Sequence, residues 1–189
     1  MERVRLASRN AHKARELEVL LPGWQIEPYD AGEYPPEAGE TYVENARGKA
    51  RFAWEDGLWS IGEDSGIEVA ALGGRPGIES ARYAPEGAPA IAKLLAELDG
   101  VHERSARYVS ELVAIAPDGE ELRGTGILTG RIADEPRGSE GFGYDPVFVP
   151  DGEARTVAEL GDAWKAQNSH RARAARALRE AVDRSRAGA

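Results

Sequence analysis

Two adjacent carboxylic acids, Glu63 and Asp64, stand at the end of a short apolar run and are followed at once by Ser65 and Gly66. Carboxylates at the end of a strand, beside a turn that brings backbone N–H groups close, can bind a hard divalent cation and activate a water molecule. A solvated acidic turn between two strands gives the same tetrapeptide, because Asp, Ser and Gly are common turn residues. Other segments of the chain must decide between these two interpretations.

A second polar segment, SRNAHK at residues 8–13, follows an expected strand at residues 4–7 and opens an amphipathic helix. The N-terminus of a helix offers unpaired N–H groups and a partial positive charge, which suit a phosphate group. Lys13, one turn into the helix, would add a point charge. The alternative is that Asn10 is only a helix cap, a position where asparagine is preferred, and that Lys13 lies at the surface.

A third candidate is Lys49, on a helix that begins with a capping box at Thr41 and Glu44. The apolar stripe of this helix is formed by Tyr42, Ala46, Ala50 and Ala53. Lys49 lies near the stripe rather than opposite to it. A lysine in this position either extends its alkyl chain along the buried face, with its charge in solvent, or reaches into a cleft.

The aromatic, glycine-rich segment GFGYDP at residues 141–146 is unusual for a plain turn. Phe142 could stack on a flat ring, and the nearby backbone could form hydrogen bonds with the edge of that ring. Alternatively, the segment is a tight turn whose Phe142 and Tyr144 side chains fold into the core. The residues alone leave both interpretations open.

Three further side chains, Lys165, His170 and Arg171, surround the start of the last expected helix, which Ser169 can cap. His170 and Arg171 are hydrogen-bond donors that can meet carbonyl oxygens or phosphate. The alternative is a capped and polar helix opening that binds no ligand.

Strands and helices alternate around these segments. Further strands are expected at residues 24–29, 59–62 and 67–72, further helices at residues 89–98 and 171–186, and a long hairpin at residues 106–116 and 121–132. This mixture predicts a mixed α/β domain.

The composition restricts the class of protein. A chain of 189 residues, 41% of them hydrophobic, is long enough for one domain with a core. A net charge of −9 argues against general nucleic-acid binding. The absence of cysteine excludes disulfides, thiol catalysis and cysteine-ligated zinc. No apolar run approaches the roughly 18 residues of a membrane span. We therefore expect a cytoplasmic protein that binds neither nucleic acid nor membrane.

Taken in order, the segments resemble one family, the inosine-triphosphate pyrophosphatase group, whose members are HAM1-like nucleoside-triphosphate pyrophosphatases that remove deaminated purine nucleotides. The matching text is LASRNAHKARELEVLL, GETYVENARGKA, EDSGIEVAALGGRPGIESARYA, GFGYDPVFVP and TVAEL…K…SHRARA. The resemblance extends from about residue 4 to residue 180, which is nearly the whole chain.

The resemblance implies a fold and an activity. The fold would be a single α/β domain over residues 1–189, elongated and two-lobed, with a central mixed sheet flanked by helices and an active site in the cleft between the lobes. The activity would be Mg²⁺-dependent hydrolysis of the purine nucleoside triphosphates ITP, dITP and XTP to the monophosphate and pyrophosphate, which keeps them out of DNA and RNA. The protein would be a homodimer.

The resemblance also assigns roles to residues. Asp64 matches the proton acceptor and a metal ligand, and Lys49 is expected to assist it as a phosphate partner. Glu37 and Glu63 are the other acids expected at the metal. The residues expected to bind substrate are Ser8, Arg9, Asn10, Ala11, His12, Lys13, Ser65, Phe142, Gly143, Tyr144, Asp145, Lys165, His170 and Arg171. Two residues depart from the family pattern: Arg9 stands where glycine is frequent, and Glu63 stands where many relatives carry aspartate.

Base selection would follow from hydrogen bonding. Hypoxanthine and xanthine present a 6-oxo acceptor where adenine has an amino donor, so donors such as Lys165, His170 or Arg171 would leave adenine poorly paired. Two alternative functions remain, and the presence of Glu37, Asp64, Lys13 and Lys49 argues against the second of them. One is a house-cleaning pyrophosphatase for modified pyrimidine triphosphates, and the other is a nucleotide-binding regulator that does not hydrolyse.

Overall fold

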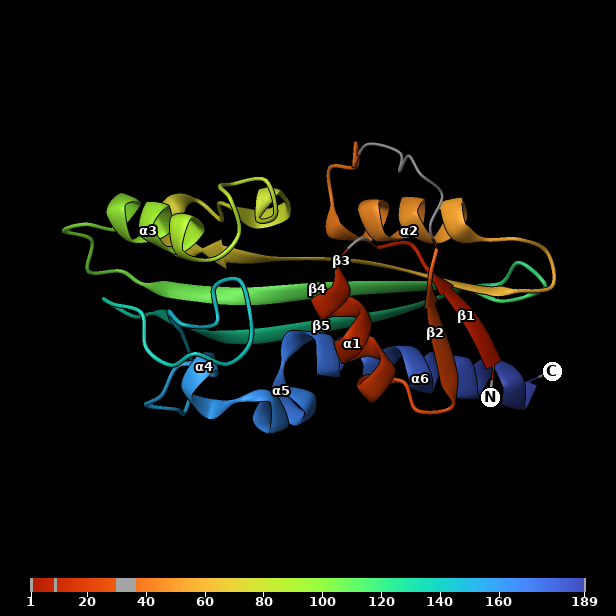
Figure 1. Ribbon diagram of the computed structural model, residues 1–189. Coiled ribbons are helices and arrows are strands. Elements are labelled where there is room, and N and C mark those ends of the chain that lie inside the picture. The colour runs from red at the N-terminus through yellow and green to blue at the C-terminus, as the bar shows by residue number, and fades with distance from the viewer. Residues whose placement is uncertain (1, 9, 30–36, 189) are drawn as a thin grey trace. The chain divides into compact units, whose positions relative to one another are not determined.

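The computed structural model describes residues 2–8, 10–29 and 37–188 (Figure 1). The strands are β1 (Glu2–Leu6), β2 (Trp24–Pro28), β3 (Trp59–Val69), β4 (Ser105–Ile115), β5 (Glu121–Ile132) and β6 (Phe148–Pro150). The helices are α1 (Ala11–Leu20), α2 (Tyr42–Ala53), α3 (Ala88–Glu97), α4 (Val157–Leu160), α5 (Asp162–Asn168) and α6 (His170–Gly188), with short 3-10 turns η1 (Ala70–Leu72) and η2 (Gly77–Glu79). Within the described ranges, no helix combines the length and the apolar character that crossing a membrane requires.

The strands form one mixed sheet in the order β2-β1-β3-β4-β5-β6. Strand β1 pairs in parallel with both β2 and β3, whereas β5 and β6 are antiparallel. The long strands β4 and β5 are neighbours, and the backbone hydrogen bond from Ala116 N to Glu120 O closes the turn that joins them. The predicted α/β class, mixed sheet and long hairpin are therefore confirmed.

The chain divides into two compact units. The first unit contains Met1–Asp64, Ser110–Gly126 and Arg171–Ala189, and the second contains Ser65–Val109 and Ile127–His170. Strands β3, β4 and β5 each contribute residues to both units. The elongated two-lobed domain with a cleft between its lobes stays a prediction.

Strand β3 departs from the sequence-based expectation. Two strands separated by a turn at residues 63–66 were expected, but β3 continues without a break from Trp59 to Val69. That prediction is wrong because Glu63 and Asp64 are not in a solvated turn: they are 1% and 4% exposed. Acids can be buried within a strand only if cations or hydrogen-bond donors neutralise them, and such partners are present in the first unit.

In the first unit, helices cover both faces of the sheet. On β4, Leu112, Ala114 and Ala116 pack in a cluster with α6, whereas Val113 and Ile115 pack in a second cluster with α2. Successive residues of a strand point to opposite faces, so α2 and α6 lie on opposite sides of β4, as Figure 1 also shows.

In the second unit, a separate core lies beneath α3. Ile91 and Leu94 of α3 belong to the same cluster as Ile67 of β3 and Phe148 of β6. Tyr144 is also part of this cluster and is 6% exposed. Of the two interpretations of the 141–146 segment, a core position is therefore correct for Tyr144.

Two glycines let the helices of the first unit approach the sheet at backbone distance. A Cβ atom at Gly62 would lie 2.0 Å from Ala46 O, and one at Gly124 would lie 2.2 Å from Ala174 O. Either contact is far inside van der Waals distance. The close packing at Gly62 brings α2, which carries Lys49, against the part of β3 that carries Asp64.

We predict that Gly62→Ala destabilises the protein by about 1–3 kcal/mol or more, because the added methyl group must push α2 away from β3. The matched control is Gly48→Ala, since a Cβ at this exposed position of α2 meets nothing within 4 Å. Gly48→Ala should stabilise the helix slightly. Thermal unfolding of both variants tests this, and equal melting temperatures would contradict the packing argument.

Candidate active site

A cluster of opposite charges surrounds Glu63 in the first unit. Its Oε2 lies 2.7 Å from Lys13 Nζ of α1, and its Oε1 accepts hydrogen bonds from Arg171 Nη2 of α6 at 3.0 Å and from Ser110 Oγ of β4 at 3.2 Å. Burial alone would raise the pKa of the Glu63 carboxyl group, but Arg171 and Lys13 outweigh it and hold this pKa well below its usual range. Glu63 is therefore an anion that ties three elements together.

Arg171 is committed to this cluster. Its guanidinium is 2% exposed, donates from Nε to Glu63 Oε1 at 3.1 Å, and forms an ion pair with Glu16 of α1. Burial opposes the charge, but Glu63 and Glu16 together raise the pKa of Arg171 further above its already high value. The structure gives the Arg171 side chain two carboxylate partners within the protein, and the substrate contact expected from the sequence stays a prediction.

Asp64, next in β3, has different surroundings. Its Oδ1 lies 3.1 Å from Lys49 Nζ, and its Oδ2 accepts a hydrogen bond from Asn45 Nδ2 at 3.1 Å. Burial raises the pKa of the Asp64 carboxyl group, and the opposing effects of Lys49 and Asn45 do not cancel this rise. A buried carboxyl group with a raised pKa, held by an amide and a lysine, is suited to exchange a proton.

The Lys49 side chain does not extend its charge into solvent. Its ammonium group reaches carboxylates inside the protein. Besides Asp64, it contacts Glu37 Oε1 at 2.5 Å and donates to the backbone oxygen of Glu63 at 3.1 Å. Burial would lower the pKa of Lys49, but Asp64 and Glu37 raise it above its usual value. Lys49 is therefore a cation at a point where two carboxylates from different segments converge.

The three acids predicted at the metal are only partly brought together. Glu37 and Asp64 share Lys49, while the carboxylate of Glu63 is held by Lys13 and Arg171. Among the described residues, no group of three or more His, Cys, Asp or Glu side chains is arranged to hold a metal ion. Mg²⁺ is usually bound by one or two carboxylates together with substrate phosphates and water. Glu37 and Asp64 fit that donor set.

The predicted phosphate turn precedes α1. Asn10 caps the helix, since its Oδ1 accepts from the backbone N–H of His12 at 2.9 Å and of Lys13 at 3.2 Å, and Ser8 Oγ accepts from Asn10 N at 3.2 Å. The cap interpretation is correct for Asn10, but Lys13 turns inward to Glu63 instead of lying at the surface. Ala11 and His12 are exposed in the first turn of the helix. Arg9 lies outside the described residues.

A second cluster, in the second unit, centres on Asp145. Its Oδ2 accepts from Lys165 Nζ at 2.8 Å and from the backbone N–H of Phe142 at 2.9 Å. Lys165 Nζ also lies 4.6 Å from the centroid of the Phe142 ring. Gly143, between these aromatic and acidic residues, has a φ of +64°, a conformation that glycine adopts readily. The sequence-predicted residues of this segment are thus brought together around one buried ion pair.

His170 and Ser65 are the remaining predicted residues of the second unit. The His170 imidazole stacks on the Tyr108 ring of β4, with centroids 4.5 Å apart and an interplanar angle of 8°. Ser65 follows Asp64 directly in β3 and is half-buried. Two ion-paired clusters are therefore present among the predicted residues, one around Glu63 and Asp64 and one around Asp145.

Four contacting residues were not assigned a role from the sequence. They are Glu16, Asn45, Tyr108 and Ser110, which contact Arg171, Asp64, Asp145 and Glu63 respectively. Asn45 lies one helical turn from Lys49 and Glu16 lies one turn from Lys13, so two of the four were close in the sequence to a candidate residue. The others lie far along the chain from their partners, so spacing gives no signal.

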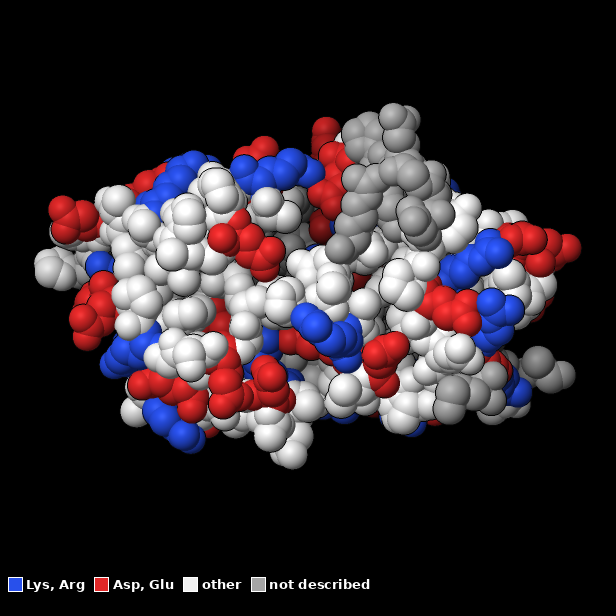
Figure 2. Space-filling model, viewed as in Figure 1, with Lys and Arg blue, Asp and Glu red and all other residues white. Residues whose placement is uncertain are grey.

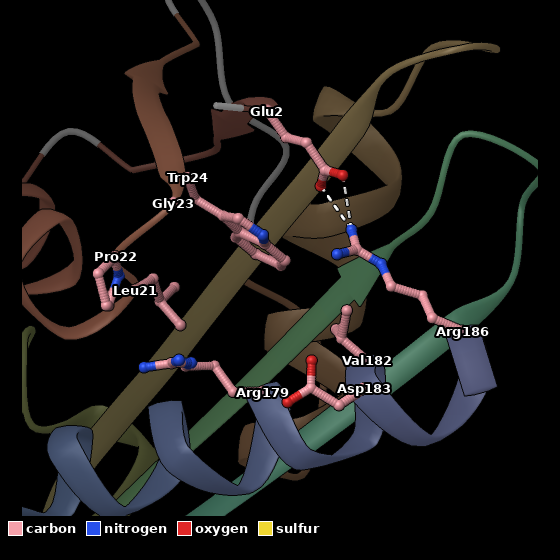
Figure 3. Close-up of a pocket in the computed structure, with 9 residues that line it drawn as sticks. All are labelled: Glu2, Leu21, Pro22, Gly23, Trp24, Arg179, Val182, Asp183 and Arg186. Carbon is pink, nitrogen blue, oxygen red and sulfur yellow. Dashed lines mark hydrogen bonds and ion pairs between the residues drawn. The ribbon is translucent and has the colours of Figure 1, made fainter.

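A cavity of about 250 Å³ in the first unit contains none of the predicted residues. It is lined by Glu2, Leu21, Pro22, Gly23, Trp24, Arg179, Val182, Asp183 and Arg186 (Figure 3). Arg186 Nη2 is paired with Glu2 at 2.6 Å across its edge. On the face of the molecule shown in Figure 2, acidic and basic side chains are interspersed.

Comparisons with known proteins agree on one family. The Ham1 family model matches residues 4–181. The dITP/XTP pyrophosphatase of Leifsonia xyli subsp. xyli is 45% identical over 188 residues, covering 94% of each chain, and that of Deinococcus radiodurans is 43% identical over 183 residues, covering 94% of this chain and 92% of the other.

Solved structures of similar proteins extend this agreement to the fold. The Ham1 protein of Staphylococcus aureus is similar with a TM-score of 0.85 and 34% identity, covering 97% of this chain and 100% of the other. The nucleoside-triphosphatase / dITP/XTP pyrophosphatase of Mycobacterium abscessus has a TM-score of 0.72 and 39% identity, covering 93% and 97%.

The charge cluster predicts a pH-dependent stability. Because the pKa of Glu63 is lowered in the folded state, the unfolded chain takes up a proton first as the pH falls, and the stabilisation from Glu63 is lost below about pH 4.3. Near pH 7, Glu63→Gln should cost about 3–5 kcal/mol, because Lys13 and Arg171 lose their buried anion.

Urea unfolding at several pH values measures both effects. The difference between the wild type and Glu63→Gln should shrink as the pH falls from 6 towards 3, whereas the exposed control Glu86→Gln should follow the wild type. A difference that stays constant with pH would contradict the assigned ionisation of Glu63.

Proposed function

Because this chain belongs to the Ham1 family, we propose that it hydrolyses ITP, dITP and XTP to the nucleoside monophosphate and pyrophosphate. The observation that carries the proposal is the likeness, over nearly the whole chain, to relatives named dITP/XTP pyrophosphatases. The paired carboxylates of β3 and their lysine partners supply groups that such a reaction needs.

Phosphate binding is proposed at the cations of the first unit. Lys13 and Lys49 carry ammonium groups that are mostly buried yet paired with carboxylates, so incoming phosphate oxygens can replace or share those partners. The N-terminus of α1, with Ser8 and Asn10 before it, adds backbone N–H groups and a partial positive charge. We also propose that substrate is bound by Arg9, Ala11 and His12 of the same segment and by Ser65, which follows Asp64 in the sequence.

Asp64 is proposed as the general base. It would take a proton from a water molecule whose oxygen attacks the α-phosphorus, while the bond from this phosphorus to the bridging oxygen breaks and pyrophosphate leaves with the electron pair. The raised pKa of Asp64 favours this role. Lys49, at 3.1 Å, would hold the carboxylate in position and offset charge on the phosphates.

Glu37 and Asp64 are proposed to hold Mg²⁺, and Glu63 is proposed as the third acid at the metal. When bound, Mg²⁺ would neutralise phosphate charge and polarise the phosphoryl oxygens. The chain's own residues would orient the triphosphate and place Asp64 for proton transfer, and positioning of this kind supplies a large part of the acceleration in many enzymes.

Base recognition is proposed in the second unit. The Phe142 ring offers a stacking surface, and Lys165 and His170 offer donors to a 6-oxo group. Asp145 anchors Lys165, and Gly143 permits the turn between Phe142 and Asp145. Tyr144, which packs in the core of the second unit, and Arg171, which pairs with Glu63, are proposed to contact the nucleotide as well. The single two-lobed domain over residues 1–189, the homodimer and the cytoplasmic location belong to this proposal as well.

Pyrophosphate release from a panel of nucleoside triphosphates tests the proposal. We expect Mg²⁺-dependent release of pyrophosphate and the nucleoside monophosphate from dITP and XTP, with little release from dGTP or dATP. Omission of Mg²⁺ or addition of a chelator should abolish release. Turnover of dUTP or methylated dTTP instead would indicate a pyrimidine-directed enzyme, and binding without turnover of any triphosphate would indicate a regulator.

A further inference from the structure

Tyr108 of β4 contacts two of the residues that we propose to read the base. Its hydroxyl donates to Asp145 Oδ1 at 3.3 Å, and its ring stacks almost parallel on the imidazole of His170. We infer that Tyr108 is a positioning residue for purine recognition, which fixes Asp145 and His170 in their places and so sets the preference for a 6-oxopurine. This inference rests on the proposed function and adds a specificity determinant to it.

The two residues that Tyr108 contacts come from different segments. Asp145 belongs to the turn that follows Gly143, and His170 is the first residue of α6. Tyr108 itself is 7% exposed in the core of the second unit, where its ring lies 4.5 Å from that of Phe148. A side chain on a central strand, packed in this way, is a rigid support for two groups that come from other segments.

The hydroxyl contact fixes the rotation of the Asp145 carboxylate. Lys165 and the Phe142 backbone N–H donate to Oδ2, and Tyr108 donates to Oδ1, so the two oxygens are held from different sides. Loss of the hydroxyl would let the carboxylate turn, and Lys165, which is bonded to it, would move as well. The donor proposed for the 6-oxo group is therefore positioned through Tyr108.

The stacking contact fixes the plane of the His170 ring. With an interplanar angle of 8°, the imidazole cannot rotate without losing contact with the tyrosine ring. The ring plane sets the directions in which its two nitrogens can donate or accept. Tyr108 thus orients a second polar group of the same recognition surface.

Tyr108→Phe tests the inference, since it removes the hydroxyl and keeps the ring. For dITP we expect KM to rise about three- to tenfold with kcat changed by less than about twofold, because base contacts made equally before and during the reaction affect binding alone. For dATP, which lacks the 6-oxo group, kcat/KM should change little. The ratio of kcat/KM for dITP to that for dATP should therefore fall at least about threefold.

Tyr83→Phe is the matched control, because Tyr83 belongs to the same unit and its hydroxyl interacts with Glu97 and Tyr144, not with Asp145, Lys165 or His170. It should leave the ratio unchanged. A Tyr108→Phe enzyme with the wild-type ratio, or with equal losses for both substrates, would overturn the inference even if its melting temperature were lowered. A wild-type protein that fails to hydrolyse dITP would instead overturn the proposed function, and this inference with it.

Discussion

The burial of two adjacent acids in one strand is the constraint on which the first unit depends. Glu63 and Asp64 lie inside β3, where an unpaired carboxylate would be severely destabilising. Their partners, Lys13, Lys49 and Arg171, come from α1, α2 and α6, so each of these three helices contributes one cation. The ionised state of the two acids therefore depends on the positions of the three helices.

The two acids are neutralised differently, and this separates their chemistry. Arg171 and Lys13 hold the pKa of Glu63 well below its usual range, whereas burial raises that of Asp64 despite Lys49 and Asn45. Neighbouring carboxyl groups whose pKa values are moved apart are suited to different roles. Glu63 is suited to be a permanent anion that orders the cations, and Asp64 is suited to exchange a proton.

The glycine contacts explain how the cations reach the acids. Lys49 meets Asp64 because Gly62 lets α2 pack against β3 at backbone distance. Arg171, at the start of α6, meets Glu63 from the other side of the sheet, where Gly124 allows similarly close packing. The lysine and arginine side chains of these helices therefore contact the carboxylates of the strand directly.

Much of this could be predicted from the sequence, and the failures have physical causes. Apolar periodicity and capping residues located most helices and strands, and the ordered segments identified the candidate residues. The break predicted in β3 was wrong because acidic and small residues usually mark a turn, and nothing local shows that cations bury them. The partnership of Arg171 with Glu16 and Glu63, and the contacts of Tyr108, join residues far apart in the chain and need the fold to be seen.

The role of Asp64 is the central claim, and its direct test is turnover of dITP with Mg²⁺ by Asp64→Asn, which preserves the shape of the side chain and its contact with Asn45. The account predicts a fall in kcat of at least about 100-fold, typical of the loss of a general base, in a protein whose circular dichroism spectrum matches the wild type. Asp183→Asn, an exposed position on α6, should retain full activity. Near-normal turnover by Asp64→Asn would contradict the account.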